Sequence, residues 1–155
     1  MKTPEIIPLF SQPLYINQIT DEEFSVVANA VINTDCTDLN TYERNGYMSE
    51  DTKWLDNNLE VKKIVEKYLE DYVHKQLAIS KRHYLDHCTS WVNLHKPGDM
   101  AQAHIHANSL FSGVLYVKTD KDSGPIRFDF PSMIPTFAPY TTEFDLDENN
   151  FYNMR

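Results

Sequence analysis

Residues 91–117 read WVNLHKPGDMAQAHIHANSLFSGVLYV, and this stretch decides the expected fold and function. Its centre is His104-Ile105-His106, in which one residue separates two imidazoles. Side chains two positions apart in an extended segment point to the same face, so both rings can turn toward one metal ion. Neutral imidazole suits iron, zinc, copper and nickel, and the pair alone does not select among them. A chance pair of surface histidines is the alternative, because the chain contains 6 His.

The neighbouring sequence is typical of β-strands. Apolar runs at residues 91–94, 110–117 and 126–130 have strand-like composition. Turn-forming residues at 96–99 and 118–124 separate them. These patterns predict three strands connected by short turns.

The first half of the chain has a helical period instead. Thr20-Asp21-Glu22-Glu23 predicts a capping box for a helix that ends near Asn33. Apolar residues at three- and four-residue steps predict a longer helix from residue 58 to about residue 79. Residues 6–16 suggest an extended segment that can act as an edge strand, since proline is tolerated there. Residues 34–56 predict a long polar loop with room for a short strand, either a solvated connection or a substrate-facing cover.

Length and composition limit the possible classes of protein. A chain of 155 residues with 41% hydrophobic content fits one domain, 1–155, with an N-terminal strand and helices in 1–83 and strands in 84–155. The net charge of -9 gives no broad cationic surface, so we do not expect nucleic acid or an anionic membrane as a partner. The sequence has no signal-peptide core and no stretch of membrane-spanning length. Cys36 and Cys88 are too few for a disulfide framework and suit a reducing cytoplasm.

Four segments together resemble a known family. Residues 90–99, the His104-Ile105-His106 centre and residues 112–117 and 123–128 are similar to the 2OG-Fe(II) oxygenases common in bacteria and their phages. The resemblance implies an α+β protein with a double-stranded β-helix (jelly-roll) core and supporting N-terminal helices. It also implies Fe(II) as the metal, 2-oxoglutarate as cosubstrate, and hydroxylation of a protein side chain or a small molecule. No catalytic residue beyond the metal ligands is implied.

The resemblance also assigns roles to individual residues. His104 corresponds to the first metal ligand, and His106 occupies the position where the wider superfamily has Asp or Glu. An imidazole there supplies no negative charge, so the iron site is expected to be more electropositive. Tyr116 corresponds to a hydroxyl that binds the distal carboxylate of 2-oxoglutarate, or is simply a strand tyrosine with its ring in the core. Asn93 and His95 are expected near the cosubstrate, with satisfied polar residues of a barrel interior as the alternative.

Other parts of the family pattern are expected to be missing. The pattern continues into a distal His and an Arg that pairs with 2-oxoglutarate, but no His follows Phe130 and Arg155 is the last residue. We therefore expect the late strands to be absent and the chain to be part of a longer protein, with a natural short form as the alternative. Unpaired sheet edges would also allow a homo-oligomer.

Two further expectations concern function. The rival to an oxygenase is a cupin-like metal-binding module or a non-catalytic binding module on the same scaffold. The loop at residues 34–56 is where we expect the primary substrate, which the sequence does not identify, to be contacted. Within that loop, the residues expected to contact the substrate are Arg44, Tyr47 and Trp54. Elsewhere in the chain, the polar residues expected to be structural or solvated are His74, His83, His87, Asp99, Glu143 and Asp145.

Overall fold

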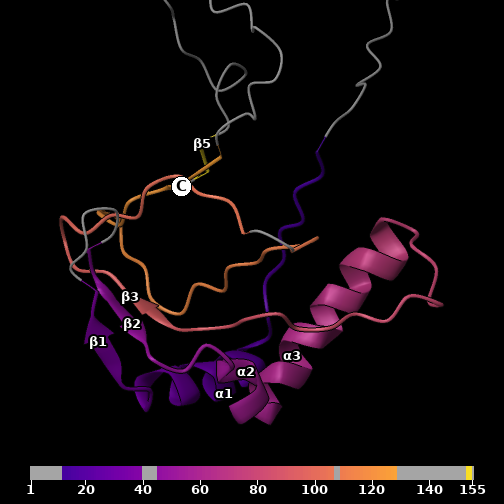
Figure 1. Ribbon diagram of the computed structural model, residues 1–155, viewed down its shortest axis with the longest axis horizontal. Helices are drawn as coiled ribbons and strands as arrows, with labels where there is room; N and C mark the ends of the chain where they lie inside the picture. Colours follow the sequence, from indigo (N-terminus) through magenta and orange to yellow (C-terminus); the bar gives the residue numbers. More distant parts are fainter. Residues whose placement is uncertain (1–11, 40–44, 107–108, 129–152, 155) are drawn as a thin grey trace, which may run out of the picture. The chain divides into compact units, whose positions relative to one another are not determined.

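The protein is described by a computed structural model that covers residues 12–39, 45–106, 109–128 and 153–154 (Figure 1). The chain divides into two compact units. Unit 1 consists of Met1–Asn33 and Leu55–His87, and unit 2 consists of Thr34–Trp54 and Cys88–Arg155. The second boundary, at His87, lies close to the expected change from helices to strands at residue 83. That the whole chain forms one domain stays a prediction.

Unit 1 contains the predicted helices. Helix α1 (Asp21–Ile32) begins with the predicted capping box, in which Thr20 Oγ1 accepts from the Glu23 amide at 3.3 Å and Glu23 Oε2 accepts from the Thr20 amide at 3.0 Å. The short helix α2 (Trp54–Asn57) precedes α3 (Leu59–Glu70), which continues without a break into the π-helical turn η1 (Asp71–Gln76). Both long helices are therefore confirmed close to their expected limits.

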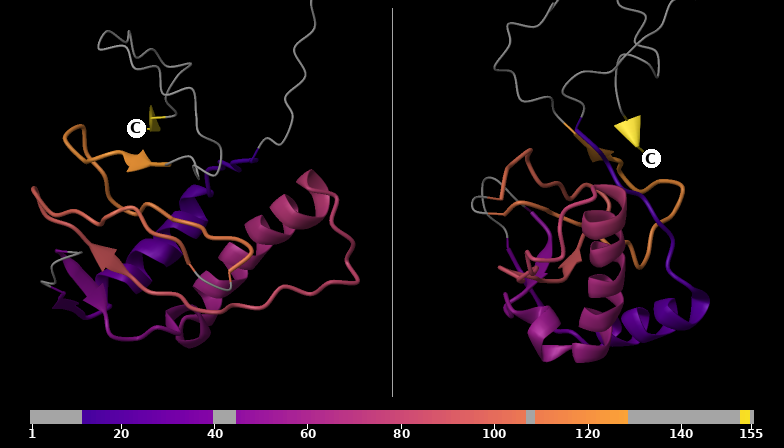
Figure 2. Two further views of the ribbon diagram at one scale, coloured as in Figure 1. Left: turned by 45° about the horizontal axis from the view of Figure 1, so that its top comes forward. Right: turned by 90° about the vertical axis from the view of Figure 1, so that its right-hand side faces the viewer.

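Helices α1 and α3 pack against each other around small apolar side chains (Figure 2). Val27, Val61 and Val73 are almost fully buried. At the edge of this contact, Glu23 accepts hydrogen bonds from Lys67 Nζ at 2.6 Å and from the Tyr68 hydroxyl at 2.7 Å. The hydrogen bond from Lys67, with those from Tyr68 and the Thr20 amide, lowers the pKa of Glu23 from 4.5 to about 2. The capping carboxylate thus also connects the two helices.

Unit 2 contains a small antiparallel sheet in the order β1-β2-β3. Its strands are β1 (Cys36–Asp38), β2 (Tyr47–Ser49) and β3 (Asn93–Leu94) (Figure 1). A second antiparallel pair joins β4 (Ile126–Arg127) to β5 (Asn153–Met154). The mixture of helices and small sheets is compatible with the expected α+β class.

The segment at residues 34–56 is more ordered than the predicted loop. It supplies β1 and β2, which are two of the three strands in the first sheet, and the start of α2. Strand β2 pairs with β1 and with β3. A polar, Asp- and Asn-rich segment does not reveal such pairing by itself, since strand formation depends on cross-strand partners more than on intrinsic preference. The expectation of a mainly irregular loop with one short strand was wrong here.

Two predicted strands are not formed in the described residues. Residues 110–117 are irregular, and most of their apolar side chains are exposed, with Leu110 at 93% and Val114 at 65%. Residues 12–16 are also irregular, while residues 6–11 and 129–130 lie outside the described residues. β-Branched and aromatic residues favour a strand only where a neighbouring strand completes the ladder and covers one face. The amino-acid composition of residues 110–117 therefore did not predict their backbone conformation.

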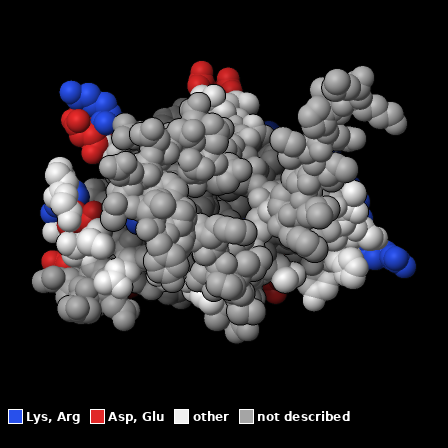
Figure 3. All heavy atoms as spheres, turned by 90° about the horizontal axis from the view of Figure 1, so that it is seen from above, with Lys and Arg blue, Asp and Glu red and all other residues white. Residues whose placement is uncertain are grey.

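The described surface has a mixed charge character. Figure 3 shows one face of the molecule, and acidic and basic side chains lie next to each other on the part of it that belongs to described residues.

Cys36 and Cys88 are both free thiols. Among the helices of the described segments, none combines the length and the apolar character needed to cross a bilayer.

Candidate metal centre

The segment that leads to the histidine pair is anchored on strand β2. Ser49, which is only 1% exposed, donates its amide to the Val92 carbonyl at 2.9 Å, and its Oγ accepts from the Val92 amide at 3.0 Å. The same hydroxyl donates to the Asp51 carbonyl at 3.2 Å. A buried serine therefore replaces one backbone acceptor and extends the β2–β3 pairing beyond the regular ladder.

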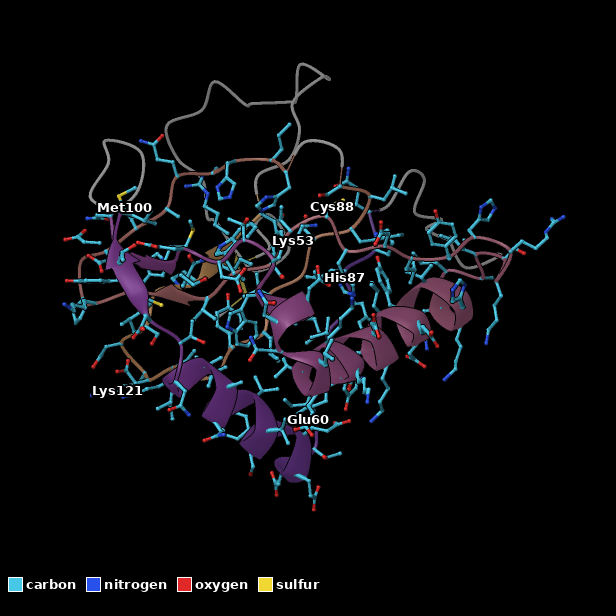
Figure 4. All side chains as sticks on the ribbon, turned by 60° about the horizontal axis from the view of Figure 1, so that its bottom comes forward. Lys53, Glu60, His87, Cys88, Met100 and Lys121 are labelled. Atoms are coloured by element: carbon cyan, nitrogen blue, oxygen red, sulfur yellow. The ribbon has the colours of Figure 1, made fainter. Side chains whose placement is uncertain are left out.

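Further bonds hold the chain on the other side of Trp91. The Ser90 amide donates to the Thr52 carbonyl at 3.0 Å, and the Trp54 amide donates to the Ser90 carbonyl at 3.1 Å. Lys53 Nζ donates to the Cys88 carbonyl at 2.8 Å, and Figure 4 shows these two residues side by side. The backbone is thus fixed at both neighbours of Trp91.

After β3 the chain makes the predicted turn at residues 96–99. The Asp99 amide donates to the Lys96 carbonyl at 2.9 Å, the Lys96 amide donates to Asp99 Oδ2 at 2.7 Å, and Gly98 has a φ of 93°. Proline followed by glycine at positive φ is the expected sequence for such a turn. Just beyond it, the Met100 amide donates to Asn45 Oδ1 at 2.6 Å, and the Asn45 amide donates to the Met100 carbonyl at 3.2 Å. These bonds hold the start of the histidine segment.

The structure brings the two predicted metal ligands together. The rings of His104 and His106 meet edge to face, with centroids 4.9 Å apart and planes inclined by 79°. Both side chains are exposed. With a metal–nitrogen bond of about 2.1 Å, each centroid lies about 3.2 Å from the metal, so two ligands are separated by about 4.5 Å at a right angle and about 5.2 Å at the tetrahedral angle. The observed separation lies between these values and fits two adjacent positions around one ion.

A second contact of His104 is compatible with one tautomer of its ring. Its Nδ1 lies 2.7 Å from the Gln102 carbonyl oxygen, and a carbonyl can only accept, so this contact is a hydrogen bond only when Nδ1 carries the proton. In that tautomer Nε2 has a free lone pair for a metal. Metal-binding histidines commonly donate their other nitrogen to a backbone carbonyl in this way. The chemistry of the donor set therefore fits a divalent first-row metal.

The ring of His106 rests beside an indole. The Trp91 and His106 ring centroids are 5.5 Å apart, with planes inclined by 49°. Trp91 is half-buried, whereas the neighbouring Val92 is 9% exposed and counts among the buried core. A continuous row of three rings therefore runs from Trp91 through His106 to His104.

The other predicted site residues are not part of this row. Asn93 lies on β3, where its register partner is Met48, and its side chain is exposed. His95 is exposed and lies close to Gly46, so close that a Cβ at Gly46 would be 3.1 Å from His95 Nδ1. Tyr116 is 53% exposed and lies in the irregular run at 110–117, so its predicted location on a strand is wrong. The roles of these three residues toward 2-oxoglutarate stay predictions.

The residues expected to contact the primary substrate have different surroundings. Trp54 is 7% exposed and donates its Nε1 to Thr34 Oγ1 at 2.8 Å, so its ring packs inside the unit, and a substrate contact through it stays a prediction. Lys96 Nζ donates to the Tyr47 hydroxyl at 2.7 Å and lies 4.1 Å from the centre of that ring. This hydrogen bond raises the pKa of Lys96. Arg44 lies outside the described residues.

Of the remaining candidates, His74 and His87 have side-chain contacts within unit 1, whereas His83 is exposed. His74 Nδ1 lies 2.9 Å from the Ile79 carbonyl, and His87 Nε2 lies 3.3 Å from Glu66 Oε1. Glu143 and Asp145 lie outside the described residues. Within residues 12–39, 45–106 and 109–128, no three His, Cys, Asp or Glu side chains gather as a metal cluster. The described centre therefore consists of two imidazoles.

Three structural features were missed by sequence reasoning, two of them at this centre and the third at Gly46. Trp91 was noted only as part of a strand, although an aromatic residue at the start of the decisive stretch was a visible signal. The Gln102 carbonyl belongs to the backbone and leaves no signal in the sequence. Gly46 signals a special backbone position, since it has a φ of 127°.

The described residues thus combine helices and small sheets, compatible with an α+β fold, with an exposed pair of imidazole rings that could hold a metal ion. The family model described as "Putative 2OG-Fe(II) oxygenase" matches residues 89–154, somewhat less than half of the chain. The match includes both histidines and strands β3, β4 and β5. The expected resemblance to this oxygenase family is therefore confirmed for that segment. Comparisons with curated proteins and with solved structures gave no match.

Proposed function

We propose that unit 2 carries the metal centre of an Fe(II)- and 2-oxoglutarate-dependent oxygenase, with His104 and His106 as two of its metal ligands. The observation that carries this proposal is the ring pair, whose 4.9 Å separation fits two adjacent positions around one ion. The family match at residues 89–154 supports iron and 2-oxoglutarate as the chemistry of that pair.

The chain's own residues have distinct tasks in this proposal. His104 binds the metal through Nε2 while the Gln102 carbonyl holds the proton on Nδ1. His106 supplies a second neutral donor, so the pair leaves the full charge of the ion to be balanced by anionic ligands such as a 2-oxo acid. Bound Fe(II) would let dioxygen act as the oxidant: one oxygen atom would go to 2-oxoglutarate, which becomes succinate and CO2, and the other would enter a C–H bond of the primary substrate.

Several finer features belong to the same proposal. Asn93, His95 and Tyr116 contact the cosubstrate, and the primary substrate is a protein side chain or a small molecule. The metal centre lies at the mouth of a jelly-roll barrel. The two free thiols suit a protein that works in a reducing cytoplasm.

The test uses the purified full-length protein under anaerobic conditions. Fe(II) and 2-oxoglutarate are added together, and the weak visible charge-transfer absorption of the chelate is recorded before oxygen is admitted and succinate is measured. His104→Ala should lose both the absorption band and stoichiometric iron. His83→Ala is the matched control, because it removes an exposed imidazole of unit 1, and it should retain both.

Two results would contradict the proposal in different ways. If the chain binds no iron, or if His104→Ala and His83→Ala bind it equally, the metal centre is not at this pair. If iron binds through His104 but 2-oxoglutarate produces neither the absorption band nor succinate, the chain is a metal-binding module of the cupin-like kind.

A further inference from the structure

We infer that Trp91 is a positioning residue of the metal centre: its indole holds the His106 imidazole in the orientation that lets both histidines bind one ion. The inference rests on the proposed function, since it assigns Trp91 a task toward the same two ligands. Trp91 does not contact the metal in this scheme and acts through His106.

The backbone around Trp91 is more firmly hydrogen-bonded than the backbone that carries His104 and His106. Trp91 lies between Ser90 and Val92, whose backbone groups are bonded to Ser49, Thr52 and Trp54 at 2.9 to 3.1 Å. Successive side chains of an extended segment point to opposite faces, so the burial of Val92 leaves the indole directed to the other face. The indole is thus presented from a fixed backbone.

The histidines lie on a less supported backbone, where the His106 carbonyl accepts from the Ser109 amide at 3.3 Å. Residues 102–106 form neither helix nor strand, and both imidazoles are exposed. His104 is oriented by its hydrogen bond to the Gln102 carbonyl. The ring contacts of His106 are with Trp91 at 5.5 Å and with His104 at 4.9 Å. With a fixed aromatic face beside it, the His106 ring already has fewer orientations before a metal binds. It therefore loses fewer orientations on metal binding.

This reduction should be visible as metal affinity. An imidazole that rotates freely loses that freedom when it coordinates, and a neighbour that has already restricted the ring lowers the entropic cost. Changes of residues that orient metal ligands commonly weaken binding by about 10- to 100-fold. An indole also provides a broad apolar face, which a phenyl ring partly reproduces and an aliphatic side chain does not.

The first measurement needs no metal. In the metal-free full chain, the imidazole protons of His106 should show a ring-current shift in the NMR spectrum, because the Trp91 ring lies beside them. Trp91→Leu should remove that shift and Trp91→Phe should retain part of it. Tyr84→Leu is the matched control, since it replaces an 88% exposed aromatic residue of unit 1 and should leave the His106 signals unchanged.

The second measurement uses Co(II) alone as the probe, with calorimetry for affinity and visible absorption for coordination geometry. Trp91→Leu should bind Co(II) about tenfold more weakly than the unchanged chain and with an altered spectrum. Trp91→Phe should restore affinity to within about threefold, and Tyr84→Leu should bind normally. Leucine keeps an apolar side chain at position 91, so Trp91→Leu is preferred to alanine for preserving the fold.

The outcomes separate this inference from the proposed function. If the ring-current shift is lost in Trp91→Leu but Co(II) affinity and spectrum are unchanged, Trp91 only packs beside His106 and the inference is overturned while the metal centre stands. If the metal-free spectrum shows no ring-current effect on His106, the inference is overturned at its geometric basis. If the unchanged chain binds no Co(II), and no iron in the preceding test, the proposed function fails and the inference fails with it.

Discussion

The substitution Ser49→Ala tests the anchoring of the segment that leads to the proposed metal centre. Ser49 Oγ is the acceptor for the Val92 amide at 3.0 Å, and Val92 is only 9% exposed, so water has little access to replace it. An orphaned buried N–H costs about 1–3 kcal/mol. We expect a loss of about 2 kcal/mol in the free energy of unfolding, which lowers the folding equilibrium constant about 30-fold.

Urea unfolding at neutral pH measures this loss, and hydrogen exchange of the Val92 amide localises it. Ser112→Ala is the matched control, because Ser112 is exposed in the same unit and its removal should change stability by less than about 0.5 kcal/mol. The reasoning would be refuted if Ser49→Ala behaved like the control in urea and left exchange at Val92 as slow as before.

Two further predictions concern the helices and the turn before β2. The pKa of Glu23 is lowered to about 2, first by Lys67, so the carboxylate stabilises the fold above pH 4.5 and loses this effect as the pH falls toward 2. Glu23→Gln should therefore flatten the decline of the urea midpoint between those pH values, and an unchanged slope would contradict it. Gly46→Ala should lower stability by more than about 1 kcal/mol in thermal unfolding, because φ is 127° and the new Cβ would lie 3.1 Å from His95 Nδ1. Gly124→Ala, which meets nothing within 4 Å, should be nearly neutral, and equal losses in both variants would refute the argument.

The helices could be predicted from the sequence because their signals are local. A capping box needs only four consecutive residues, and the bonds between Thr20 and Glu23 are present as expected. The apolar spacing of α3 likewise lies within a single segment. The turn at residues 96–99 was predictable for the same reason, since proline and glycine specify its backbone directly.

The sheet was not predictable to the same extent because its pairing is not local. The Ser49–Val92 connection joins residues 43 positions apart, and nothing in either segment names the other. The opposite error occurred at residues 110–117, where strong strand composition has no strand in the structure. For the site, the spacing of His104 and His106 was sufficient to predict that they meet, whereas the contact with Trp91 depends on this distant pairing.

The order in which the chain is made gives the Ser49–Val92 connection a further consequence. Unit 2 is discontinuous, so β2 is synthesised long before the segment that completes its sheet, and Leu55–His87 of unit 1 lies between them. Closing a loop of this length carries a length-dependent entropic cost of about 3 kcal/mol, which early folding of the intervening helix reduces by shortening the flexible chain. Metal binding at His104 and His106 should therefore be a late event in folding. In a refolding experiment, the rate of metal binding should match the rate at which the Ser49–Val92 connection of unit 2 forms.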